Sequence, residues 1–84
     1  MAVNTAQYSI TTTASQIVPD GISAQECHIH VASGAIYIGN STVTSSTGLR
    51  LDNGDKLTFE VHGQGMWAVT STGTASVFTM WIDQ

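Results

Sequence analysis

The stretch ECHIHVA, residues 26–32, alternates regularly between polar and apolar side chains. Cys27, Ile29 and Val31 fall on one side of an extended backbone, and the polar residues between them fall on the other side. A period of two predicts a β-strand with one buried face, and no helical period persists for two turns anywhere in the chain. This stretch therefore places the protein among all-β folds.

Turn signals separate this strand from other short apolar runs. Asn53-Gly54 is typical of a tight hairpin turn, because both residues tolerate positive φ. Such signals at a spacing of roughly 8–12 residues are typical of sandwiches and barrels. The pattern predicts a small antiparallel β-sandwich or barrel, jelly-roll-like, with six to eight short strands. The turn signals lie at residues 19–21, 33–34, 39–40, 52–55, 63–65 and 71–73.

The 84 residues are enough for one domain. Residues 26–84 are predicted to form its body. The polar segment 1–25 is predicted to be an N-terminal arm or an edge strand. Within the body, Val43 and Leu49 are expected to be the apolar anchors of a Ser/Thr-rich segment.

The last predicted strand, TASVFTMWI, is apolar on both faces. Val77 and Trp81 lie on one face, and Phe78, Met80 and Ile82 lie on the other. A chain this short has little material to cover two faces, so we expect one of them to contact another subunit. The alternative is a central strand of a closed barrel. The predicted interface residues are Trp67, Phe78, Met80, Trp81 and Ile82.

The composition argues against nucleic-acid and membrane partners. Only two residues are basic, and the net charge is −4, whereas binding to phosphates requires several Lys or Arg residues together. Charged residues make up 10% of the chain, and serine and threonine runs take their place. Such a surface suits packing against other protein. The N-terminus has no leader pattern, so we expect synthesis in the cytoplasm without a standard export signal.

Three histidines are the only residues that suggest a metal site. His28 and His30 project from one face of their strand, and His62 lies on the outward face of a later strand. If those strands pair, three imidazoles could cluster and bind zinc. The simpler alternative is ordinary surface or interface histidines, and no metal or other cofactor is predicted.

No catalytic residue is predicted, and the chain is not expected to be an enzyme. Cys27 lies on the apolar side of its strand, away from the histidines, and a buried thiol is inert. No Gly-x-Ser-x-Gly motif is present. Asp52 and Asp55 flank a turn, where aspartate commonly bonds the backbone.

Several segments resemble a small β module of virion proteins in tailed bacteriophages. The resemblance is carried by GAIYIG at 34–39, Val43-Thr44, Gly48-Leu49 and GDKL at 54–57. The segments 66–69 and 73–77 fit the same layout, so the match spans about residues 29–82. The resemblance implies a capsid decoration, or cement, protein or a head-fibre protein. It further implies a homotrimer on the capsid surface with the major capsid protein as partner.

Two other functions are also compatible with the sequence. A tail-fibre or tail-tip module would recognise a surface glycan through exposed aromatic side chains. A small metalloenzyme would use the three histidines.

Overall fold

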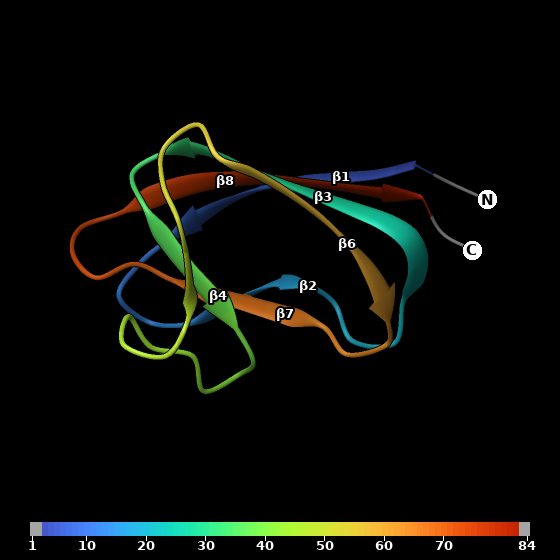
Figure 1. The fold of residues 1–84 in the computed structure, drawn as a ribbon, viewed down its shortest axis with the longest axis horizontal. Helices are drawn as coiled ribbons and strands as arrows, with labels where there is room; N and C mark the ends of the chain where they lie inside the picture. The colour runs from blue at the N-terminus through green and yellow to red at the C-terminus, as the bar shows by residue number, and fades with distance from the viewer. Residues whose placement is uncertain (1–2, 83–84) are drawn as a thin grey trace.

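The computed structural model describes residues 3–82, except for the side chains of Ala24 and Gln25, and it shows eight strands in two stacked layers (Figure 1). Residues 3–82 contain no helix, and hence none long and apolar enough to cross a membrane. The strands are β1 (Val3–Ile10), β2 (Ser15–Val18), β3 (Ser23–Ser33), β4 (Ile36–Gly39), β5 (Leu49–Leu51), β6 (Lys56–His62), β7 (Met66–Val69) and β8 (Ala75–Ile82).

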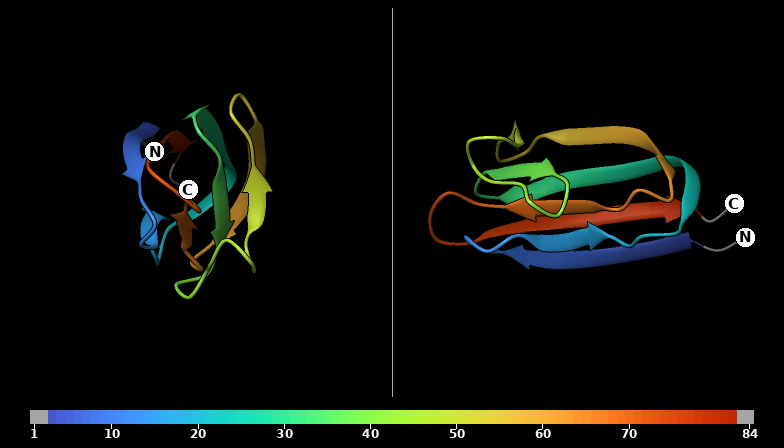
Figure 2. Two further views of the ribbon diagram at one scale, coloured as in Figure 1. Left: turned by 90° about the vertical axis from the view of Figure 1, so that its left-hand side faces the viewer. Right: turned by 90° about the horizontal axis from the view of Figure 1, so that it is seen from below.

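The strands form two antiparallel sheets of four. Sheet A has the order β1-β8-β3-β6, and sheet B has the order β2-β7-β4-β5. Strand 1 pairs with 8, 2 with 7, 3 with 6 and 4 with 5, so the chain folds as one long hairpin wrapped into two layers. This is the arrangement of a jelly roll. The all-β prediction is confirmed, and the fold is a sandwich of two separate sheets (Figure 2).

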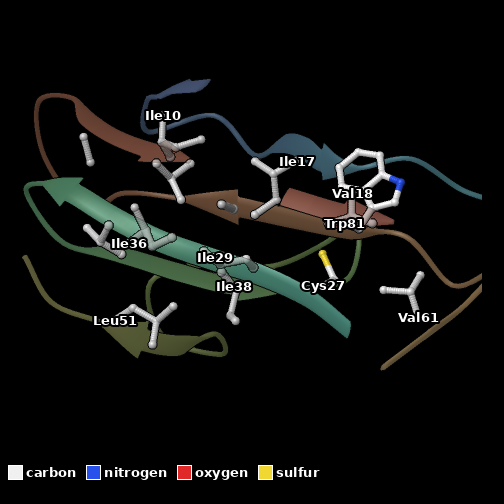
Figure 3. Packing of buried hydrophobic residues seen from close by; sticks show 14 residues of the cluster. Ile10, Ile17, Val18, Cys27, Ile29, Ile36, Ile38, Leu51, Val61 and Trp81 are labelled. Carbon is white, nitrogen blue, oxygen red and sulfur yellow. The ribbon is translucent and has the colours of Figure 1, made fainter. Parts of the chain in front are cut away.

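The core lies between the sheets and is built from alternate residues of each strand. Ile17 and Ile38 enter it from sheet B, and Ile29 and Val77 enter it from sheet A. Trp81 belongs to this core and is only 7% exposed. Figure 3 shows its indole among the labelled core side chains. Trp81, predicted as an interface residue, is thus covered within a single copy of the chain.

The N-terminal strands are part of the sandwich. β1 forms one edge of sheet A and pairs with β8 in unbroken register along its whole length. β2 forms one edge of sheet B. The boundary predicted between residues 25 and 26 falls inside β3. Of the two alternatives for segment 1–25, the structure therefore has the edge strand and no separate arm among the residues described.

The turn at residues 52–55 corrects the hairpin prediction. It joins β5 of sheet B to β6 of sheet A, so its flanking strands do not pair with each other. Gly54 has φ +88°, and its N–H donates to the Val31 carbonyl at 2.9 Å. The Val31 N–H donates in turn to the Asp55 carbonyl at 3.0 Å. The Asn-Gly pair does form a tight turn, but the hydrogen bonds of this turn to β3 direct the following strand into sheet A.

The loop at residues 40–48 folds back over the outer side of β4. Asn40 Oδ1 accepts hydrogen bonds from the N–H and hydroxyl of Thr42, which fixes the start of the loop. Val43 is 6% exposed, as predicted for an anchor. Gly48 lies against Tyr37, where a Cβ would come within 2.7 Å of the Tyr37 Cβ. Leu49, the second predicted anchor, is 59% exposed at the edge of sheet B, so that prediction is wrong.

Candidate interaction surface

The outer face of sheet A, called the open face below, carries an apolar stripe on β8. The stripe consists of Phe78, Met80 and Ile82, which are 39%, 41% and 42% exposed. They alternate with the buried residues of the same strand, because successive side chains of a β-strand point to opposite faces. The two-faced character predicted for this strand is therefore observed, with one face in the core and one at the surface.

The edge strand β1 extends this surface. Its outward side chains are exposed and uncharged, and Val3 continues the apolar stripe at one end. The unbroken register places each of them directly beside one member of the stripe. These cross-strand neighbours are Val3 for Ile82, Thr5 for Met80 and Gln7 for Phe78.

On the other side of the stripe, β3 contributes two histidines. His28 lies beside Met80, and His30 lies beside Phe78. The His28 Nδ1 atom is 3.0 Å from the Thr58 hydroxyl, and the His30 ring is tilted against the Phe78 ring with centroids 6.2 Å apart. Both imidazoles are half-buried and lie alongside the apolar stripe.

A shallow hollow of about 480 Å³ opens at the centre of the open face. Mainly apolar surface lines it, and the polar groups at its rim come from β1 and β3. Such a hollow can receive an apolar side chain of a protein partner. The side chains that shape it are Thr5, Gln7, His28, His30, Phe78 and Met80.

His62 does not join the other two histidines. β6 pairs with β3, as the metal hypothesis required. His28, however, lies opposite Thr58, and His62 lies four residues beyond Thr58 on β6, opposite Ser23. The His62 Nε2 atom is instead 3.0 Å from the Glu60 carboxylate. Among the described residues, no three His, Cys, Asp or Glu side chains are grouped to hold a metal ion. The three histidines, considered together as a possible cluster, therefore do not come together.

The charges of the open face are separated along the strand direction. Lys56 lies opposite His30 at one end of the face. Glu60 lies four residues further along β6, and Glu26 precedes the buried Cys27 in β3. β1 and β8 contribute no charged residue between Val3 and Ile10 or between Ala75 and Ile82. The face therefore has a lysine at one end and glutamates at the other, and its middle row, Met80, His28 and Thr58, contains no Lys, Arg, Asp or Glu.

The other residues considered for chemistry have structural roles. Cys27 is fully buried, and this burial raises the pKa of its thiol to about 11, so that it stays protonated and unreactive. Asp55 Oδ2 accepts a hydrogen bond from the Asp52 N–H at 2.8 Å, which closes the turn. Asp52 also pairs with Arg50 at 2.7 Å on the exposed surface, and this contact raises the pKa of the guanidinium.

Three of the five predicted interface residues share the open face. Trp81 is in the core, and Trp67 lies half-buried on β7, opposite Gln16 and Gly39, on the outward side of sheet B. The sequence did not single out Thr5 and Gln7 for this surface. In the sequence, only the alternating pattern of β1 places Thr5 and Gln7 on one side of a strand. Their position beside the stripe follows from the pairing of β1 with β8, which the sequence pattern does not show.

No protein-family model, curated protein or solved structure matches this chain. The resemblance to phage virion modules therefore stays a prediction from the sequence.

Proposed function

We propose that this chain is a structural protein of a bacteriophage virion, a capsid decoration protein that binds the assembled head as an oligomer and stabilises it. The major capsid protein would be its partner, and the outer surface of the capsid its location.

The apolar stripe on the open face is the observation that carries this proposal. Completing the burial of side chains that are already about three-fifths covered contributes about 1 kcal/mol each. That is weak for a single contact and adds up when several copies associate in one assembly. A stripe that remains exposed in one copy is a surface for association with protein.

The remaining surface supports an assembly role. Charged residues are only 10% of the chain, so contact with a shell requires little desolvation of ions. Jelly rolls occur in viral capsid proteins, although they occur also in lectins, and a fold alone does not decide a function.

The arrangement of aromatic residues gives less support to the glycan-binding alternative. Sugars stack best on exposed tryptophan or tyrosine rings. Trp81 is buried, Trp67 is half-buried on the opposite sheet, and Phe78 is the only aromatic residue of the stripe.

Labelling of virus particles with an antibody against this protein tests the proposal. We expect gold label distributed over the whole head in electron micrographs. Particles stripped of the protein should release DNA at a lower temperature than intact ones, and added protein should restore their stability. Label confined to the tail tip would favour the glycan-binding alternative and overturn the proposal. Particles without label would overturn it as well.

A further inference from the structure

We propose that the open face pairs with the same face of a second copy, about a two-fold axis that runs across the strands. In this pair, Lys56 of each copy contacts Glu60 of the other. The inference names the subunit contact of the proposed oligomer, but it rests on the geometry of the open face and would hold without a role in a virion.

The separation of charge along the open face selects this axis. Lys56 and His30 lie in one row across the sheet, and Met80, His28 and Thr58 lie in the next row along the strands. Glu60 lies in the row after that, and with Glu26 it forms the acidic end of the face. An axis through the Met80 row brings the basic end of each copy over the acidic end of the other.

The same operation matches the apolar stripe to itself. Met80 lies on the axis and meets Met80 of the second copy, while Phe78 meets Ile82 of the second copy. The hollow beside Phe78 and Met80 leaves room for that Ile82 side chain. Two-fold contacts use one self-complementary patch twice, and this face has that property. An axis parallel to the strands would instead place the charges of β6 over the uncharged β1.

The area fits a weak, reversible pair. Four strands about 4.8 Å apart and about seven residues long give a footprint of about 450 Å² per copy. Two copies then bury about 900 Å², which is the size of a weak, transient interface. We expect dissociation in the micromolar range.

The ion pairs lie at the rim of this contact. Lys56 is exposed and takes part in no ion pair among residues 3–82. Glu60 is exposed and lies 3.0 Å from His62, so one carboxylate oxygen is already engaged. Each cross-copy pair therefore acts mainly by selecting the orientation, and reversal of one charge places like charges together twice per dimer.

Charge exchange tests the pairing by sedimentation velocity and light scattering. Wild-type protein should form particles of twice the chain mass of 8.8 kDa at micromolar concentration. Lys56→Glu alone and Glu60→Lys alone should each raise the dissociation constant at least about 10-fold. An equimolar mixture of the two variants should form heterodimers, because both cross-copy contacts then join opposite charges. The double variant K56E/E60K should pair like wild type.

Variants elsewhere on the chain provide matched controls. Arg50→Glu and Asp20→Lys produce the same changes in net charge on exposed positions outside sheet A, and they should leave the dissociation constant unchanged. Met80→Glu puts two carboxylates together on the axis and should weaken pairing at least about 100-fold. Leu49→Glu, at the more accessible edge of sheet B, should not. Circular dichroism confirms that each variant is folded.

Several results would overturn the inference. These are a wild-type monomer at 100 µM, a trimer as the resemblance implies, or no recovery in the mixture of the two charge variants. A dimer that survives Met80→Glu and both charge reversals would place the contact elsewhere, for instance at the uncharged edge of β1. If the protein is found on phage heads but is a trimer in solution, only this inference fails. If the protein forms the proposed dimer but binds no virus particle, only the proposed function fails.

Discussion

The outer faces of the two sheets both carry apolar side chains on a central strand, but these side chains differ in how far they are exposed. Each carries large apolar side chains on a central strand, Val69 and Trp67 on β7 and the apolar stripe on β8. On sheet B, the loop at residues 40–48 folds back over β4, and Val69 is only 5% exposed. On sheet A, the stripe keeps about two-fifths of its surface accessible.

The two faces differ because the loop at residues 40–48 lies on the outer side of sheet B and not on sheet A. Val43 and Val69 are buried but lie outside the core cluster between the sheets. Val43 lies against Gly39 and Gly48, and Val69 lies opposite Tyr37, on the outer side of sheet B. No comparable segment of residues 3–82 buries the stripe on β8. The outer side of sheet B is thus partly covered within the molecule, and the stripe on sheet A stays exposed.

The largest expected effect separates the two sides of β8. Trp81→Ala should lower the free energy of unfolding by about 3–5 kcal/mol, because it empties a buried site of the core. Ile82→Ala, one residue on and facing outward, should cost less than about 1.5 kcal/mol in dilute monomer. Urea denaturation measures both. Equal losses would mean that the open face is sealed in a single copy.

The pH dependence of stability reports on the inner side of β3. Burial raises the pKa of Cys27 from 9.0 to about 11, so the folded state holds its proton where the unfolded chain loses it. This contribution to stability is complete below pH 9 and is lost as the pH rises to 11, by about 2–3 kcal/mol. Cys27→Ala should show a flatter decline over the same range, and parallel curves would exclude the thiol as the cause.

A pair of valine truncations compares the covered face with the open one. Val43→Ala should cost about 2 kcal/mol, because the loop loses its buried contact with Gly39 and Gly48. Val3→Ala, at a side chain 65% exposed on the open face, should cost less than about 0.5 kcal/mol. Thermal unfolding at low protein concentration measures the difference. A larger loss at Val3 would reverse the assignment of the two faces.

The smallest effect is a gain. Thr79 lies on the core side of β8, and its hydroxyl is buried without a hydrogen-bond partner among the residues that the structure describes. Thr79→Val keeps the shape and removes that unpaired group, so stability should rise by about 1 kcal/mol. Thr70→Val is the matched control and should destabilise, because the Thr70 hydroxyl donates to the Ala35 carbonyl at 3.0 Å. A loss for Thr79→Val would point to a partner such as a buried water.

The alternation of side chains predicted the class of fold and the two faces of β8. It could not predict which face meets the core, since Trp81 and Phe78 are both large and apolar. Burial of Trp81 follows from the way sheet B packs over sheet A. The exposure of Leu49 has a similar origin, because the three-residue strand β5 forms the edge of sheet B.

The histidine hypothesis failed on register and not on strand pairing. β3 and β6 do pair, but an offset of four residues between Thr58 and His62 separates His62 from His28 by about 13 Å along the strand. Register depends on the connection that precedes β6. Here that connection is a turn docked on Val31, a contact between residues more than twenty positions apart in the chain.

By itself, the sequence determined that this protein is built from short strands, because a period of two and frequent turns leave no other way to bury its apolar side chains. The tertiary structure alone decided which of two apolar faces stays open, and which charges lie beside it. The physical reason is that local alternation sorts residues onto two sides of a strand, whereas only packing between sheets and loops assigns those sides to core or surface.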